Sequence, residues 1–318
     1  MITYITGDLF ESPAKVLVNT VNTVGVMGKG IAKQFKTYYP DMFREYQRHC
    51  ESGALEVGKL WLYRTPNKLI LNFPTKKHWR QPSKPEFIEA GLKKFVESYA
   101  ARGLTSVAFP RLGCGNGELD WEAQVRPLMK KYLLPLPIDV LIYVHPHNDL
   151  QPEHLDSKRM AQWLRQEPET LAFTEVWSDL LAFVDRGETI AIEGIPHTLS
   201  LGRRLEVSDE SGEQIELETI EVGGEHASIF SRQDLLEVWQ SLRASGICRA
   251  ASLPRGLDAH VVSLFALLER LPYVIPVRVA GQEEDLARAR GLQLAPARAG
   301  RSLRPSSEIR SAHPLTQV

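Results

Sequence analysis

The chain has 318 residues, enough for two domains with hydrophobic cores, and its 43% hydrophobic and 24% charged residues are typical of a soluble globular protein. Its apolar runs are shorter than the roughly 18 residues that a membrane helix needs, and its start lacks a signal segment, which favours the cytoplasm. Three scattered cysteines argue against a disulfide framework and against a zinc site.

The charge is distributed unevenly along the chain, although it sums to −1. Residues 1–150 carry 20 Lys and Arg against 14 Asp and Glu, residues 151–285 carry 12 against 24, and residues 286–318 carry six arginines against one glutamate. The net charge thus changes from +6 to −12 to +5 between these three ranges, and such shifts indicate domain boundaries. We therefore predict a first domain at 1–150, a linker at 151–170, an acidic domain at 171–285 and a basic disordered tail at 286–318.

Strand and helix patterns alternate through the first 150 residues. Apolar and β-branched runs predict strands at 2–6, 15–21, 60–64, 69–73, 105–109 and 138–144. Apolar residues at helical spacing predict helices at 31–38, 41–51, 85–101 and 121–132. This alternation predicts an α/β domain built on a mixed sheet.

The acidic region has a different order of elements, which predicts a smaller α+β domain. A helix is expected at 174–185, alternating segments at 189–222, a helix at 235–244 preceded by a capping box, an apolar helix at 258–270 and a strand at 273–279. Eight acidic residues lie between Glu206 and Glu225, with a hairpin turn expected at Ser211-Gly212.

Two glycine-rich loops follow buried strands of the first domain, at 25–30 and 113–117. Glycine allows φ > 0 and lets the backbone approach a ligand closely, and the helix that begins behind the first loop presents free N–H groups that favour phosphate. Loops at strand ends frame the ligand crevice of an α/β sheet, so these two can enclose a diphosphate. The first loop matches neither GxxxxGK[ST] nor GxGxxG, and a glycine-rich connector without a ligand remains an alternative.

Two polar residues at strand ends are candidates for recognising the rest of a nucleotide. Asp8 follows the first strand, and its carboxylate suits an exocyclic amine such as that of adenine. Asn22 ends the second strand and can hydrogen-bond a sugar hydroxyl. A helix-cap or turn role is an equally good interpretation of Asp8, and a purely local role is equally open for Asn22.

Three motifs occur in order in the first domain: Gly7-Asp8-Leu9-Phe10, the run from Asn19 to Gly30, and Pro110-Arg111-Leu112-Gly113-Cys114-Gly115. Together they resemble the macrodomain family of ADP-ribose binders and hydrolases, over residues 1–147. The resemblance implies a three-layer α/β fold, and nothing in the sequence requires a metal or a cofactor. The residues that it implies for ADP-ribose binding are Asp8, Leu9, Asn22, Gly25, Val26, Met27, Gly28, Lys29, Gly30, Gly113, Cys114, Gly115, Asn116 and Gly117.

The segment Asn72-Phe73-Pro74-Thr75-Lys76-Lys77-His78-Trp79-Arg80 is similar to one typical of the DarG branch of this family. That branch contains antitoxins that are DNA ADP-ribosyl glycohydrolases, so the resemblance implies removal of ADP-ribose from thymidine bases in DNA. Its catalytic lysine follows a threonine, which carries over to Lys76. A related human hydrolase pairs its lysine with an aspartate in the second glycine-rich loop, at the position of Gly117 here, and this departure leaves the acid/base partner open.

The chemistry that this resemblance asks of Lys76 is reasonable for a lysine. Cleavage of an N-glycosidic bond passes through an oxocarbenium-like state, and a neutral amine in a partly buried site can attack the anomeric carbon and form a Schiff base after ring opening. As a cation, the same side chain can instead stabilise the diphosphate or the leaving base. A solvated loop charge is the alternative without a function.

Residues Lys77, Trp79 and Arg80 combine basic and aromatic groups, which suits contact with ADP-ribosylated DNA; a solvated basic loop is the alternative. The acidic region has no catalytic signature, and its charge would complement a basic DNA-modifying partner of the DarT type, which the resemblance implies. Two other functions remain open for the first domain. One is hydrolysis of protein-linked ADP-ribose, and the other is ADP-ribose binding without chemistry.

Overall fold

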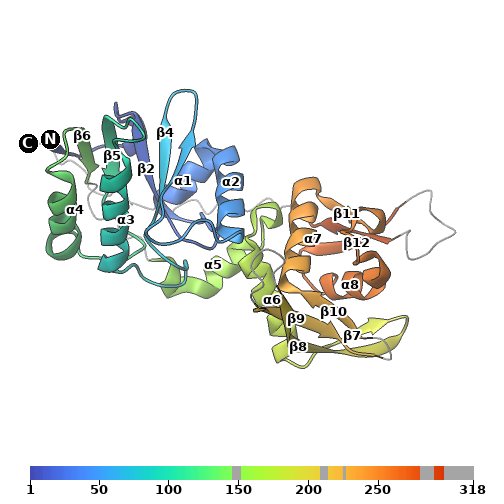
Figure 1. The fold of residues 1–318 in the computed structure, drawn as a ribbon. Coiled ribbons are helices and arrows are strands. Elements are labelled where there is room, and N and C mark those ends of the chain that lie inside the picture. Colours follow the sequence, from blue (N-terminus) through green and yellow to red (C-terminus); the bar gives the residue numbers. More distant parts are fainter. Residues whose placement is uncertain (145–151, 208–213, 225–226, 280–289, 297–318) are drawn as a thin grey trace, which may run out of the picture.

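The computed structural model describes residues 1–144, 152–207, 214–224, 227–279 and 290–296. These residues form two parts, an N-terminal part built on one large sheet and a C-terminal part built on two smaller sheets (Figure 1).

Six strands of the N-terminal part form a mixed sheet in the order β1-β6-β5-β2-β4-β3. The strands are β1 (Ile2–Ile5), β2 (Val16–Val21), β3 (Trp61–Arg64), β4 (Leu69–Pro74), β5 (Ser106–Pro110) and β6 (Asp139–Tyr143). The neighbours β1–β6, β6–β5, β5–β2 and β2–β4 pair in parallel, whereas β3 is an edge strand antiparallel to β4. The parallel strands therefore end on the same edge of the sheet.

Helices cover both faces of this sheet, which gives three layers. On one face lie α1 (Gly30–Tyr38) and α2 (Pro40–Glu51), and on the other lie α3 (Pro85–Ser98), the π-helical turn η2 (Trp121–Val125) and α4 (Arg126–Leu133). The side chains of β2 alternate between the two cores, Val16 and Val18 toward α3 and α4, Leu17 toward α1 and α2. A central strand buried on both faces needs this continuous apolar sequence. The predicted α/β domain with a mixed sheet is thus confirmed.

The described residues of the C-terminal part form a four-stranded antiparallel sheet, a three-stranded antiparallel sheet and three α-helices. The first sheet has the order β10-β9-β8-β7, and its strands are β7 (Thr189–Ile192), β8 (Ile195–Val207), β9 (Gln214–Val222) and β10 (Ser228–Ser231). The second has the order β11-β13-β12, and its strands are β11 (Ile247–Arg249), β12 (Val274–Arg278) and β13 (Arg290–Leu294). The helices are α6 (Phe173–Asp185), α7 (Arg232–Ser245) and α8 (Val261–Leu268), and the expected capping box at Ser231 and Asp234 begins α7.

The strand β13 corrects one prediction, the start of the disordered tail at residue 286. Arg290–Leu294 is the central strand of its sheet, with Leu292 and Leu294 buried in the core. Its pattern is too short to stand out among the arginines and prolines that follow it. The rest of the predicted tail, 297–318, and the expected turn at Ser211-Gly212 lie outside the described residues.

Residues that were predicted as a linker contain short helices that lie against the N-terminal part. They form η3 (Glu153–Asp156), α5 (Ser157–Leu164) and η4 (Pro168–Thr170), and Figure 1 shows α5 and α6 between the two sheet-containing parts. Within the described ranges, every helix is too short or too polar to cross a membrane.

Candidate active site

A pocket opens at the carboxyl ends of four neighbouring parallel strands. The last residues of β2, β5 and β6, together with Thr75 directly behind β4, line it. Carboxyl ends of parallel strands are where ligands bind in α/β sheets. The lining residues are Thr20, Val21, Asn22, Val26, Lys29, Gly30, Ile31, Ala32, Thr75, Lys76, Pro110, Arg111, Gly113, Gly115, Asn116, Gly117 and Tyr143.

Both glycine-rich loops line this pocket, as does Lys76. The first loop contributes Val26, Lys29 and Gly30, and it leads into α1, whose N-terminal N–H groups begin at the pocket. The second loop contributes the stretch 113–117 without the buried Cys114. Backbone N–H groups on two sides suit the diphosphate for which the loops were predicted.

The side chain of Asn22 organises the first loop. Its amide group donates to the Val26 carbonyl oxygen at 2.7 Å, and its side-chain oxygen accepts from the backbone N–H of Val24, from that of Val26 and from the Tyr46 hydroxyl. One N–H of the amide is left for a ligand. The local role that was left open at the sequence level is therefore present.

Six residues that were implied for ADP-ribose binding lie off the pocket wall, among them the buried Cys114. Asp8 caps the short helix η1 (Leu9–Glu11) by accepting from the Phe10 N–H at 2.9 Å, and Leu9 is buried. Met27 is buried against Asn19, and Gly28 lies under Met160 and Trp163 of α5, where a Cβ would collide with the Met160 methyl group. Gly25 packs against Gln47 and Ala172 in a left-handed turn with φ of +81°.

Lys76 stands in a segment, residues 75–83, that we call the lysine segment. It begins where β4 ends, and its first residue donates to the Val21 carbonyl oxygen at 2.8 Å. The Lys77 carbonyl oxygen accepts from the N–H and hydroxyl of Thr23. At its far end, Ser83 donates its N–H to the Gly117 carbonyl oxygen at 3.0 Å. The segment is thus tied to residues directly before the first glycine-rich loop and to the second loop, and Lys76, only 5% exposed, lines the pocket that both loops reach.

The packing at Gly117 explains why this chain has no carboxylate there. A Cβ at this position would overlap the Gly113 carbonyl oxygen and the Ser83 hydroxyl. The next residue, Glu118, adopts φ of +62°, a left-handed conformation that is uncommon outside glycine, and its carboxylate lies 2.9 Å from the Nε2 of His154. A side chain at 117 is therefore incompatible with the contact between this loop and the lysine segment.

The three residues predicted to contact DNA are placed differently from one another. Lys77 is exposed, but Trp79 is fully buried, and its Nε1 donates to Glu175 at 3.0 Å. Arg80 makes a bidentate ion pair with the same carboxylate, with both N–O distances 2.6 Å. Stacking of Trp79 on a base is not available in this arrangement, because the ring is buried and the Arg80 guanidinium lies over it, 4.2 Å from the ring centroid. The sequence could not indicate this, because Glu175 is 95 residues away and has the pattern of an ordinary polar helix residue.

Two pKa shifts define the electrostatics around the lysine segment. Burial lowers the pKa of His78, and the positive charges of Arg80 and Lys76 add to this, while Glu175 acts in the opposite direction. Burial raises the pKa of Cys114 to about 12, so its thiol stays protonated at neutral pH and is unsuited to act as a nucleophile. The lysine is then the better candidate for covalent chemistry in this pocket.

Several residues of the pocket and its surroundings were missed at the sequence level. Thr75, Arg111 and Tyr143 line the pocket, and Ser83 and Glu175 hold the lysine segment. Arg111 and Thr75 lie inside the quoted motifs and could have been included. Tyr143 and Glu175 carry no local signal, since only the fold brings them to this place.

Comparison with known proteins places the N-terminal part in a family. Residues 18–128 match the family model described as Macro domain. A DNA ADP-ribosyl glycohydrolase of Mycobacterium tuberculosis is 48% identical over 147 residues, which are 45% of this chain and 42% of that protein. A DNA ADP-ribosyl transferase–DNA ADP-ribosyl glycohydrolase fusion protein of Thermosipho africanus is 40% identical over 162 residues, again 45% of this chain and 42% of the relative.

A solved structure, the macrodomain of Mycobacterium tuberculosis DarG, is 47% identical, with a TM-score of 0.44, and covers 46% of this chain and 99% of its own. The present chain spans about two fifths of the length of the curated relatives it matches. The matched region is the one that carries the two glycine-rich loops and Lys76. The N-terminal domain of this chain therefore contains a region, residues 18–128, that matches the Macro domain family.

Proposed function

We propose that this protein is an ADP-ribosyl glycohydrolase that removes ADP-ribose from thymidine bases in DNA. The observation that carries the proposal is the position of Lys76, which lines the same pocket as both glycine-rich loops, at the carboxyl ends of parallel strands. The identity of 48% to a DNA ADP-ribosyl glycohydrolase over the same region supports the substrate class.

In this proposal the two loops bind the diphosphate through backbone N–H groups, and Lys76 acts at the anomeric carbon of the ribose that is linked to the base. As a nucleophile its amine forms a bond to that carbon while the bond to the base nitrogen breaks, and the base leaves with the electron pair and takes up a proton. The bond between the anomeric carbon and the ring oxygen then breaks, the ring oxygen takes up the proton that the lysine nitrogen loses, and the resulting Schiff base is hydrolysed by water, which frees Lys76 and releases ADP-ribose. As a cation, Lys76 would instead stabilise charge that develops during direct attack by water.

The test is turnover of an ADP-ribosylated thymidine oligonucleotide by the full chain. Lys76→Ala should lose turnover by at least about 100-fold, on the order of the effect of removing a group that acts in the transition state, and should still bind ADP-ribose. Lys84→Ala, an exposed lysine outside the pocket, is the matched control and should retain wild-type turnover. Equal activity of all three proteins would remove Lys76 from the mechanism.

The same experiment separates two other functions. Release of ADP-ribose from modified protein but not from the oligonucleotide would favour a hydrolase of protein-linked ADP-ribose. Tight ADP-ribose binding without turnover of either substrate would favour a binding module. The exposed Lys77 is the remaining candidate for a contact with DNA, since Trp79 is buried.

We further propose that the protein acts as an antitoxin and that its acidic C-terminal part binds a DNA ADP-ribosyltransferase of the DarT type. Two observations support this: the net charge of −12 over residues 151–285, and the relative in which a transferase and a glycohydrolase form one chain. Replacement of the exposed Glu216 and Glu218 of β9 by glutamine should weaken binding of the cognate transferase at low salt, measured by calorimetry. Unchanged affinity would rule out this face.

A further inference from the structure

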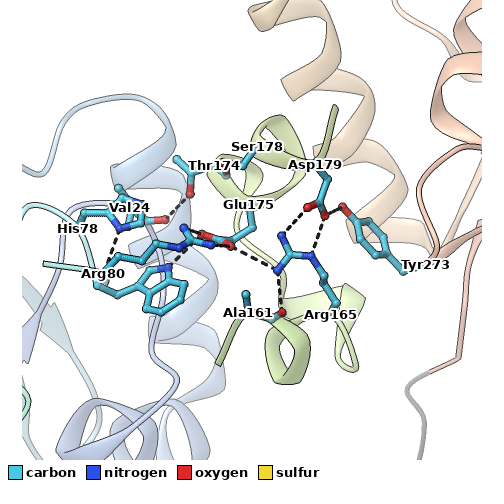
Figure 2. A network of polar contacts seen from close by, with 11 residues as sticks. Val24, His78, Arg80, Ala161, Arg165, Thr174, Glu175, Ser178, Asp179 and Tyr273 are labelled. Atoms are coloured by element: carbon cyan, nitrogen blue, oxygen red, sulfur yellow. Dashed lines mark hydrogen bonds and ion pairs between the residues drawn. The ribbon is translucent and has the colours of Figure 1, made fainter. Parts of the chain in front are cut away.

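The carboxylate of Glu175 stands at the boundary between the two parts of the chain, next to the lysine segment. It lies in the first turn of α6, and its side chain is 0% exposed. Arg80 donates two hydrogen bonds to it, Trp79 donates one, and Arg165 approaches to 3.5 Å (Figure 2). Two of these four contacts form a planar bidentate pair, which fixes orientation as well as distance.

The position of this carboxylate is determined by the C-terminal part of the chain. Arg165 is itself held by Asp179 through two hydrogen bonds of 2.8 and 2.6 Å, and Asp179 also accepts from the Tyr273 hydroxyl at 2.9 Å. Figure 2 shows this series of contacts running from Arg80 through Glu175 and Arg165 to Tyr273. A movement of α6 would therefore move the anchor of the lysine segment.

Apolar contacts join the same elements. Trp79 and Val26 belong to the hydrophobic core of the C-terminal part, together with Phe173 and Val176 of α6. Val26 also lines the pocket, and the Thr174 hydroxyl donates to the carbonyl oxygen of neighbouring Val24 at 3.3 Å. One end of α6 thus contacts both the first glycine-rich loop and the lysine segment.

Resting on the function proposed above, we propose that Glu175 is a positioning residue for the lysine segment, so that the C-terminal part of the chain completes the active site. The segment has no regular secondary structure between β4 and α3, and its backbone hydrogen bonds to Val21, Thr23 and Gly117 lie near its ends. Glu175 supplies the third anchor, at Trp79 and Arg80, three and four residues from Lys76. Misplacement of a reacting group by about 1 Å can reduce a rate about 100-fold.

The test compares two variants of the full chain. Glu175→Gln keeps the shape of the side chain but removes the charge that Arg80 and Arg165 share. Glu51→Gln is the matched control, because Glu51 is also a buried carboxylate that joins the two parts, through Arg243 and Gln240, but it lies on α2 away from the lysine segment. Two readouts are measured for each variant well below its unfolding temperature: amide hydrogen exchange across residues 75–83, and kcat and KM for the oligonucleotide.

We expect Glu175→Gln to raise exchange in the lysine segment and to lower kcat about tenfold or more, with a smaller change in KM. Glu51→Gln should leave both readouts at wild-type values. Unchanged exchange in Glu175→Gln, or equal losses in both variants, would overturn the proposal. If the wild type has no turnover, the proposed function fails, while the exchange data still decide whether Glu175 orders the segment.

Discussion

At the residue scale, the environment of His78 makes the lysine segment sensitive to pH. Burial and the neighbouring charges of Arg80 and Lys76 lower the pKa of this imidazole, so it is neutral at pH 7. Because the unfolded chain takes up this proton at a higher pH than the folded chain does, the contribution of His78 to stability is lost as the pH falls below about 6.5.

A proton titration followed by nuclear magnetic resonance checks this environment. The His78 ring should titrate below about 6.5 in the wild type. In Glu175→Gln its midpoint should be lower still, because the carboxylate of Glu175 favours protonation of the ring. A higher midpoint in the variant would contradict the described arrangement of Arg80, Glu175 and His78.

The residue scale is also where the sequence was least informative. The motif at 72–80 indicated that Lys76 lies at a site, and the structure places it on the pocket wall. The neighbouring Trp79 and Arg80 looked equally functional, since basic and aromatic residues in a loop have the composition of a nucleic-acid contact. Their partner is a glutamate 95 and 96 residues away along the chain, and no local pattern encodes such a pairing.

At the element scale, strands and helices of the first domain followed from periodicity, because each element is long and buried on one or two defined faces. The strand β13 could not be predicted in this way. It has five residues with two buried leucines, which is too short a pattern to recognise next to an arginine-rich sequence. The same limit applies to the lysine segment. Its path depends on Thr23, Gly117 and Glu175 from three other elements.

The two glycines at 115 and 117 give a prediction at this scale. Gly117→Ala should destabilise the fold by about 1–3 kcal/mol, the usual cost of inserting a methyl group into a packed site, because its Cβ meets the Gly113 carbonyl oxygen and Ser83. Gly115→Ala points its Cβ into open space and should have little effect or stabilise by about 0.4–1 kcal/mol. Urea unfolding at pH 7 measures both, and equal stability of the two variants would contradict the packing described.

At the scale of the whole molecule, ion pairs between described residues connect the two parts of the chain. Among them are Lys36 with Glu167, Glu51 with Arg243 and Glu175 with Arg80. The last two each contain a carboxylate that is at most 6% exposed. Buried charges tolerate little separation from their partners, so the two parts should unfold together rather than as independent units.

The pH dependence of this joint stability is the last prediction. Burial alone would raise the pKa of Glu175, but the hydrogen bonds and charges of Arg80, Trp79 and Arg165 outweigh it and hold the pKa below the ordinary value of 4.5. Because the pKa of Glu175 is lower in the folded state than in the unfolded state, this carboxylate stabilises the fold at every pH above its unfolded-state pKa. The stabilisation is lost as the pH falls toward the folded-state pKa. Glu175→Gln should therefore cost about 3–5 kcal/mol at pH 7, typical of breaking a buried pair, and progressively less below pH 4.5. Urea midpoints of the two proteins across this range measure the effect, and a difference independent of pH would show that the glutamate acts by shape rather than by charge.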